Sequence, residues 1–343
     1  MCTGLRLACA DGAVVHGRTV EFAVDLDLDV MHVPAGTTFT SGLSAGAGAS
    51  WTTAHSVVGV GRASADAVMD GINDAGLTAG AFYFPGTADY AADDGGADGV
   101  APQDFVHWVL TTCASIAEMR DRIHEVRVLA VDAPEWGGVA PFHYVVYDPD
   151  GTSVAVEPIA KTLQITDNPF GSLTNSPELG FHLKNLSQYM QVTPHTPDTI
   201  SIGATPITGF GTGTGSLGLP GDFTSPSRFV RATLFSADHS TPATAAAGIQ
   251  EVFHILNQFD IPYGFITVHE AGEERVEWTL GTVAHDPGAG AFYFRSYGDQ
   301  TLRRVTLADL DTAENGHITR TSMGPAIGDL TAVVDANATL APS

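Results

Sequence analysis

Apolar and polar residues alternate in short runs along much of this chain, a spacing typical of half-buried β-strands. Runs on either side of Asp11-Gly12 and of Asp148-Pro149-Asp150-Gly151 flank sequences that favour tight reversals, and therefore predict antiparallel hairpins. Further strands are predicted at 57–60, 77–84, 274–280, 291–297 and 301–305, with a turn over 71–76. The pattern predicts a largely antiparallel β structure.

Other segments have the period of an amphipathic helix. One helix is predicted to run from a cap at Asp104 to about residue 127, and two more cover 228–237 and 243–259. A few helices beside many antiparallel strands indicate the α+β class. No internal repeat or change of composition divides the chain, so residues 1–343 are predicted to form a single domain.

The charge balance limits the partners of this protein. It has 39 acidic and 15 basic residues, a net charge of −24. Such a balance argues against binding to nucleic acid or to an anionic membrane. No stretch approaches the ~20 apolar residues of a membrane span, and the first residues lack the pattern of a signal peptide. We therefore expect a cytoplasmic protein.

The sequence offers no pattern for a metal or a cofactor. Cys2, Cys9 and Cys113 form no CxxC pair, and the thirteen histidines contain no HExxH motif. Cys9 and Cys113 are interpreted as small buried apolar residues. We expect no metal and no cofactor.

Cys2 is the residue with the clearest chemical potential. Removal of Met1 would leave a chain that begins with a thiol and a free α-amine on one residue. Such an amine titrates near ~7.7–8.0, so part of it is an unprotonated base at neutral pH. A nucleophile activated by the chain's own amine is an established solution to acyl transfer. The alternative is that Cys2 is only a small residue at a frayed terminus.

The predicted N-terminal hairpin favours the catalytic interpretation. It returns Arg18 and Glu21 to the side of Cys2. An arginine near a thiol stabilises the thiolate, and a carboxylate nearby can hold the amine or the arginine in place. Nucleophile, base, cation and carboxylate would then lie within one hairpin.

Met1-Cys2-Thr3-Gly4, followed by His16-Gly17-Arg18-Thr19-Val20-Glu21-Phe22, resembles the start of the choloylglycine hydrolase family. This group of N-terminal-nucleophile amidases includes bile salt hydrolases and penicillin V acylases. Further similar segments follow in the family's order: 76–86 with Tyr83-Phe84-Pro85-Gly86, Leu173-Thr174-Asn175-Ser176-Pro177, 221–229, 254–262 and 293–297.

The resemblance implies a fold and a set of roles. The fold would be a four-layer αββα sandwich with Cys2 at the end of a central strand. The Asn175 side chain and the backbone N–H of Tyr83 would donate to the oxyanion. Arg18 and Arg228 stand where the family has its two catalytic-site arginines.

Two further positions bear on the chemistry and on specificity. Glu21 stands where the family usually has Asp, which is a departure of one methylene. Phe22 and Tyr83 are expected to contact substrate. Bile salt hydrolases tend to have Asn at the position of Tyr83 and penicillin V acylases Tyr, so Tyr83 favours a penicillin V-like or N-acyl homoserine lactone substrate.

These observations leave several functions open. The leading hypothesis is a cysteine amidase that cleaves linear carboxamides of small molecules, with bile salt hydrolysis as the alternative within the class. A catalytically silent binding protein on the same scaffold is the alternative if Met1 is retained. Residues 185–227 are long and rich in Thr, Gly and Pro. Ordered segments of that length usually have a function, and the resemblance implies a homotetramer in which this segment reaches neighbouring subunits.

Overall fold

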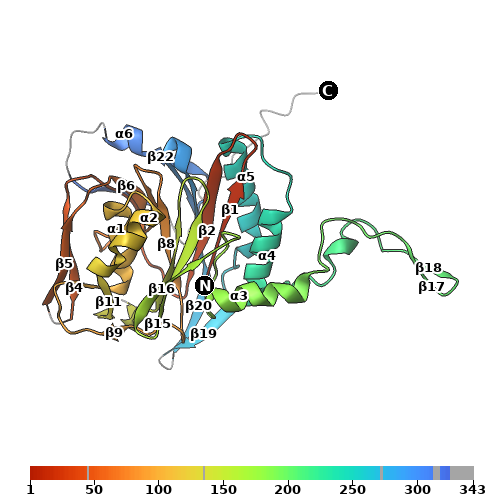
Figure 1. Ribbon diagram of the computed structural model, residues 1–343, viewed down its shortest axis with the longest axis horizontal. Coiled ribbons are helices and arrows are strands. Elements are labelled where there is room, and N and C mark those ends of the chain that lie inside the picture. Colours follow the sequence, from red (N-terminus) through yellow and green to blue (C-terminus); the bar gives the residue numbers. More distant parts are fainter. Residues whose placement is uncertain (45, 134–135, 271–272, 312–316, 325–343) are drawn as a thin grey trace.

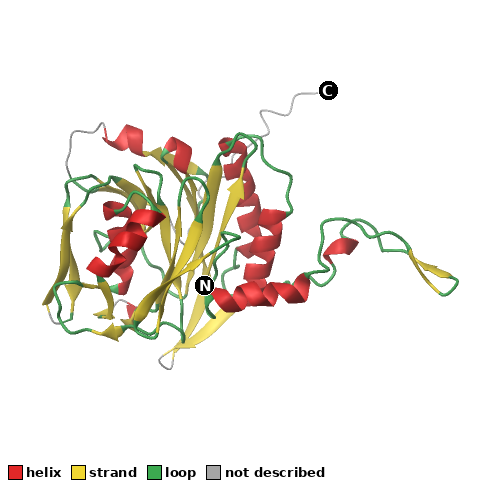
Figure 2. Ribbon diagram, in the orientation of Figure 1, coloured by secondary structure: helices red, strands yellow, loops and turns green. Residues whose placement is uncertain are grey.

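In the computed structural model, two β-sheets pack face to face and helices cover both outer faces (Figures 1 and 2). The structure describes residues 1–44, 46–133, 136–270, 273–311 and 317–324. The layers follow the order α, β, β, α, which confirms the predicted α+β class. None of the helices in these ranges combines the length and the apolar character needed to cross a membrane.

The first sheet is antiparallel and contains the N-terminal hairpin. Its strands are, in spatial order, β1 (Cys2–Ala8), β2 (Val14–Phe22), β20 (Glu273–Asp286), β21 (Ala291–Ser296) and β22 (Arg303–Thr306), with β19 (Ile266–Glu270) paired to β20. The predicted hairpin is confirmed, and its turn spans 9–13.

The second sheet is also antiparallel and forms the other inner layer. Its strands are, in order, β16 (Thr162–Asp167), β15 (Ser153–Ile159), β14 (Phe142–Tyr147), β8 (Thr78–Tyr83), β7 (Val68–Asn73), β6 (Val57–Arg62), β3 (Leu28–Val33) and β23 (Thr319–Ser322). Short strands pair at the periphery: β4 (Thr38–Leu43) with β5 (Gly46–Thr52), β11 (Arg127–Ala130) with β9 (Ala91–Ala92) and β10 (Gly99–Val100), β12 (Asp132–Ala133) with β13 (Gly138–Val139), and β17 (Ile200–Ile202) with β18 (Thr205–Ile207).

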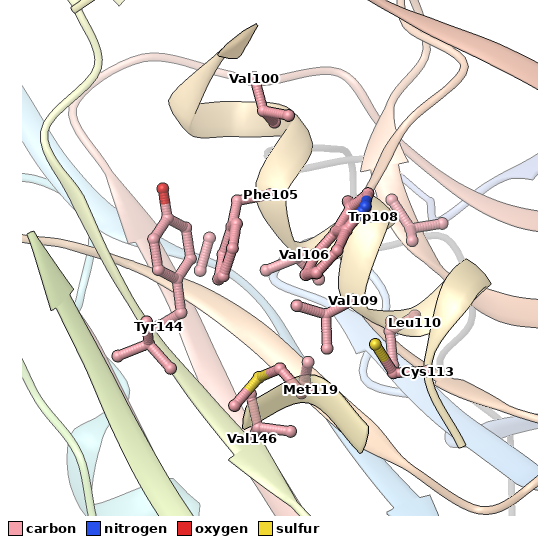
Figure 3. Close-up of a cluster of buried hydrophobic side chains, with 14 of the residues drawn as sticks. Val100, Phe105, Val106, Trp108, Val109, Leu110, Cys113, Met119, Tyr144 and Val146 are labelled. Carbon is pink, nitrogen blue, oxygen red and sulfur yellow. The ribbon is translucent and has the colours of Figure 1, made fainter. Parts of the chain in front are cut away.

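Helices cover the outer face of each sheet. Helices α1 (Phe105–Thr112) and α2 (Ile116–Arg122) cover the second sheet, and α4 (Ser225–Ala237) and α5 (Ala245–Leu256) cover the first. Helix α3 (Leu179–Asn185) packs with Phe82 through Leu179, and α6 (Leu307–Asp311) packs into the layer between the sheets through Leu307. Helices α1 and α2 pack on the second sheet, where Phe105, Val109 and Met119 meet Tyr144 and Val146 in one buried cluster (Figure 3).

One apolar layer lies between the two sheets, and another lies between the first sheet and the helices that cover it. Between the sheets, Val20 and Val283 of the first pack with Ile72 of the second. On the far side of the first sheet, Val252 of α5 packs on Val15. Burial of each such side chain contributes about 1.5–3 kcal/mol.

Two predicted elements were wrong. The helix predicted over 104–127 is two helices, because Cys113 is extended and the Ser115 side chain starts α2 by accepting from the Glu118 backbone N–H at 3.1 Å. Asp104 does not cap with its side chain; it accepts from the Ser41 hydroxyl at 2.7 Å. The turn predicted over 71–76 begins too early, because Gly71 lies inside β7.

Residues 190–224, which we call the arm, extend away from the layered body beyond α3 (Figure 1). The strands β17 and β18 near its tip pair with each other. Large apolar side chains of the arm are exposed: Met190, Ile200, Ile202, Ile207, Phe210 and Leu217. A groove of about 420 Å³ separates the base of the arm from α4 and α5.

Candidate active site

The register of the N-terminal hairpin places Arg18 and Glu21 beside Cys2. Cys2 is opposite Val20 and Gly4 is opposite Arg18. Cys2 is 4% exposed, so it is a buried residue and not part of a frayed terminus. The hairpin thus forms one side of the site from residues close in sequence.

Arg18 lies against the Cys2 sulfur. Its Nη2 donates to Cys2 Sγ at 2.8 Å, and its Nη1 donates to the Ala81 carbonyl at 2.5 Å. The guanidinium carbon lies 4.0 Å from the centre of the Phe82 ring, and Nη1 lies 3.6 Å from Asp70 Oδ2. Burial lowers the pKa of Arg18, but the negative charges of Cys2 and Asp70 outweigh it and raise that pKa. A charged guanidinium is therefore held at the sulfur.

A second segment reaches the site through hydrogen bonds to β1. Gly4 and Leu173 exchange backbone hydrogen bonds of 2.8 and 3.1 Å, which brings Asn175 alongside Cys2. Asn175 Oδ1 accepts from the Cys2 backbone N–H at 2.9 Å, and its Nδ2 donates to the Tyr83 carbonyl at 2.6 Å. An amide nitrogen carries two N–H groups, so Asn175 can make this contact and also donate to an oxyanion.

Arg228 ties these segments together from α4. It donates to the Cys2 carbonyl, to Thr3 Oγ1 at 2.7 Å and to Asn175 Oδ1 at 2.5 Å. The side chain is buried, and burial lowers the pKa of Arg228. Its contacts to the Cys2 backbone and to Asn175 fix these two residues relative to each other.

In the described chain Met1 is present, and its α-amine contacts two groups. It pairs with the Glu277 carboxylate and donates to the Glu21 carbonyl at 3.0 Å. The Glu21 carboxylate instead accepts from Thr279 Oγ1 at 3.2 Å. Burial raises the pKa of Glu21 from 4.5 to about 7, and the nearby amine and Arg228 oppose that rise.

An aromatic wall lies next to this cluster. Phe22 packs edge-on against Tyr83 and against Trp136, with ring centres 5.5 and 5.3 Å apart. All three side chains are half-buried. Because the Tyr83 carbonyl accepts from Asn175, the wall is continuous with the part of the site that contains Asn175.

The structure brings together every site residue that the sequence predicted. It adds Asp70, Glu277, Thr279 and Trp136, which lie on strands or loops far away in the sequence and carry no local motif. Within the described ranges, no group of three or more His, Cys, Asp or Glu side chains is arranged to hold a metal ion.

Comparison with known proteins identifies the family. The family model for linear amide C–N hydrolases of the choloylglycine hydrolase family matches residues 2–320. The chain belongs to the choloylglycine hydrolase family. Its members hydrolyse linear amide C–N bonds, so this protein is a hydrolase of that class.

Proteins similar to this chain in sequence are named for bile salts, and one that shares its fold is named for penicillin V. A bile salt hydrolase/transferase of Bifidobacterium longum is 29% identical over 314 residues, covering 91% of this chain and 96% of the relative. A crystal structure of a conjugated bile acid hydrolase variant from Clostridium perfringens superposes with a TM-score of 0.83 at 26% identity, covering 97% of this chain and 100% of that chain. A penicillin V acylase from Agrobacterium tumefaciens shares the fold, with a TM-score of 0.77 at 20% identity over 95% of this chain and 92% of that chain.

The raised pKa of Glu21 predicts a pH-dependent effect on stability. The folded carboxyl binds its proton more tightly than the unfolded one, so Glu21 increasingly destabilises the fold as pH rises from 4.5 through about 7. We expect Glu21→Gln to raise the free energy of unfolding by up to about 3 kcal/mol at pH 8, since each pKa unit corresponds to about 1.4 kcal/mol. The gain should be smaller at pH 5.5.

Urea unfolding of both proteins at the two pH values measures this difference. Glu274→Gln is the matched control, because Glu274 is exposed and its variant should show no such pH dependence. An equal effect of Glu21→Gln at both pH values would contradict the prediction.

Proposed function

We propose that this member of the choloylglycine hydrolase family uses Cys2 as an N-terminal nucleophile after removal of Met1. The contact of Arg18 Nη2 with Cys2 Sγ at 2.8 Å supports the proposal best. A guanidinium at this distance stabilises a thiolate. Glu277 and the Glu21 carbonyl already contact an amine next to Cys2, and these groups can bind the new α-amine.

The reaction proceeds in two acyl-transfer steps. The α-amine of Cys2 takes the thiol proton, and the sulfur attacks the carbonyl carbon of the substrate amide. Asn175 Nδ2 and the Tyr83 backbone N–H donate to the oxyanion, where one such donor contributes ~2.7–4 kcal/mol in serine proteases. The α-ammonium protonates the leaving amine, and a C–S bond replaces the broken C–N bond. Water activated by the α-amine then hydrolyses the thioester, which releases the acid and restores the thiol.

The substrate is proposed to be an amide with an aryl or long acyl group, such as penicillin V or an N-acyl homoserine lactone. Phe22, Tyr83 and Trp136 form an aromatic wall beside the nucleophile. Aromatic walls bind flat or extended apolar groups through large buried area. Conjugated bile salts are the second candidate, because relatives at 29% identity carry that name.

The arm is proposed to join subunits into a homotetramer. Phe210, Ile202 and Leu217 of the arm are 110%, 69% and 85% exposed. Exposed apolar side chains in this number indicate an interaction surface. A groove lies between the base of the arm on one side and helices α4 and α5 on the other. Its lining includes apolar side chains such as Leu219 and Leu234, and the arm of a second copy can bind there.

Replacing the nucleophile tests the mechanism. We expect the mature wild-type protein to lack Met1 by intact-mass measurement. Cys2→Ser should keep the fold and substrate binding but lose nearly all turnover, because a hydroxyl is a much weaker nucleophile at neutral pH. An active preparation that fully retains Met1 would rule out the amine mechanism.

A panel of three substrates tests specificity. Amine release from penicillin V, a glycine-conjugated bile salt and a long-chain acyl homoserine lactone should give the highest kcat/KM for one of the non-steroid amides. Tyr83→Asn should shift the ratio towards the bile salt, while Tyr189→Asn, on the segment leading into the arm, should leave it unchanged. A wild-type preference for the bile salt would favour the second candidate.

Light scattering across a salt series tests the assembly. The net charge of −24 opposes association at low ionic strength, so tetramers should form at moderate or high salt and dissociate towards dimers as salt is removed. Phe210→Asp should weaken assembly more than Thr212→Asp, which adds the same charge to the arm without removing apolar area. A monomer at every salt concentration would show that the arm has another role.

A further inference from the structure

Behind Arg18, on the side away from Cys2, the two sheets enclose a cluster of buried polar side chains. His16 of β2 and His285 of β20 are paired across the first sheet, and Asp70 of β7 faces them from the second. The four side chains Arg18, His16, His285 and Asp70 are 5%, 1%, 2% and 3% exposed. They line a cavity of about 10 Å³, which also borders Tyr147.

These residues form a chain of contacts that leads to the nucleophile. Arg18 Nη2 lies 2.8 Å from Cys2 Sγ, and Arg18 Nη1 lies 3.6 Å from Asp70 Oδ2. The other oxygen of Asp70, Oδ1, lies 2.9 Å from His285 Nε2. Sulfur, guanidinium, carboxylate and imidazole therefore follow one another from the site into the interior.

Burying these polar side chains costs free energy of folding that apolar side chains in the same place would not cost. Both ring nitrogens of His16 and the Nδ1 atom of His285 have no hydrogen-bond partner among the described residues. Buried polar groups in that state cost about 1–3 kcal/mol each. Apolar residues of similar volume would pack here at lower cost.

The neighbouring strand β8 has a glycine, Gly80, opposite Asp70, and the missing side chain leaves room for the carboxylate. A Cβ on Gly80 would lie 2.3 Å from Asp70 Oδ2 and 3.4 Å from Arg18 Nη1. Any larger residue at this position would push the carboxylate away from the guanidinium. The glycine at position 80 of β8 therefore leaves the space in which Asp70 and Arg18 form their ion pair.

We propose that Asp70 and His285 are positioning residues for the amidase reaction: Asp70 holds the Arg18 guanidinium against the Cys2 sulfur, and His285 holds Asp70. The inference rests on the proposed role of Cys2 as nucleophile. Asp70 balances the buried charge of Arg18 from the side opposite the sulfur. Without that carboxylate, the guanidinium loses a partner that fixes its orientation, and the thiolate loses part of its stabilisation.

The groups that face Asp70 and Arg18 come from several elements. His16 lies on β2 and stacks on Tyr147 of β14 with ring centres 4.3 Å apart, and Glu21 lies further along β2. Burial holds the pKa of His16 well below its usual range, with His285 adding to the effect, so His16 remains neutral beside the pair. The charges that Arg18 meets are then those of Cys2, Asp70 and Glu21.

The test compares Asp70→Asn with wild type in two measurements. Asp70→Asn keeps the shape of the side chain and removes its charge. We expect kcat to fall about tenfold or more with little change in KM, because a guanidinium that is no longer held against the sulfur stabilises the thiolate less; a tenfold loss corresponds to about 1.4 kcal/mol. The pH profile of Cys2 alkylation by iodoacetamide, followed on the peptide that contains Cys2, should shift to higher pH.

Matched variants separate positioning from general stability. Asp74→Asn disrupts an exposed His–Asp pair, His55 Nδ1 to Asp74 Oδ1 at 2.5 Å, and should change neither measurement. His285→Gln retains a donor near the position of Nε2 and should keep most of the activity, whereas His285→Leu should reproduce the defect of Asp70→Asn. If Asp70→Asn does not fold, the comparison of His285→Gln with His285→Leu still tests the positioning role.

The outcomes distinguish this inference from the proposed function. Turnover that survives Cys2→Ser would refute the nucleophile and this inference with it. An inactive Cys2→Ser together with wild-type kcat and alkylation profile for Asp70→Asn would overturn the positioning role alone. Equal loss of activity in His285→Gln and His285→Leu would also contradict it, because the retained donor would then have no value.

Discussion

Burial of the Arg18 guanidinium against the Cys2 sulfur is the interaction on which the site depends. A buried cation is stable only when charges and hydrogen-bond acceptors around it replace water. The Cys2 sulfur provides one contact, the Ala81 carbonyl another, and Asp70 a carboxylate from the opposite sheet. Arg18 can therefore reach its position only when the two sheets are packed together.

Close packing of the sheets in turn requires small residues at defined positions. A Cβ on Gly4 would lie 2.7 Å from Phe82 Cζ, and Phe82 is the ring over which the Arg18 guanidinium lies. Gly80 leaves room for Asp70 on the neighbouring strand of the second sheet, from which Asp70 reaches Arg18. These glycines lower the β-propensity of their strands, but they allow a charged pair between two layers that otherwise bury apolar side chains.

A second set of constraints fixes the position of Asn175. Reciprocal hydrogen bonds between Gly4 and Leu173 align residues 173–175 with β1, and Arg228 reaches from α4 to both Cys2 and Asn175. Cys2 and Asn175 are thus held by one arginine and one short strand contact. Strand β1 and helix α4 therefore position the loop that carries Asn175.

The sequence alone determined the part of this site that lies within the N-terminal hairpin. The turn at 9–13 and the alternation of its flanking strands set the hairpin register, and the register places Arg18 and Glu21 beside Cys2. Asn175, Tyr83 and Arg228 were predicted through resemblance to the family, because no local pattern connects them. Only the tertiary structure decided that Glu277, Asp70, His285 and Trp136 join them, and that β7 continues through Gly71. The reason is physical: hairpin register follows from neighbouring residues, whereas contacts between two sheets depend on packing between segments far apart in the chain.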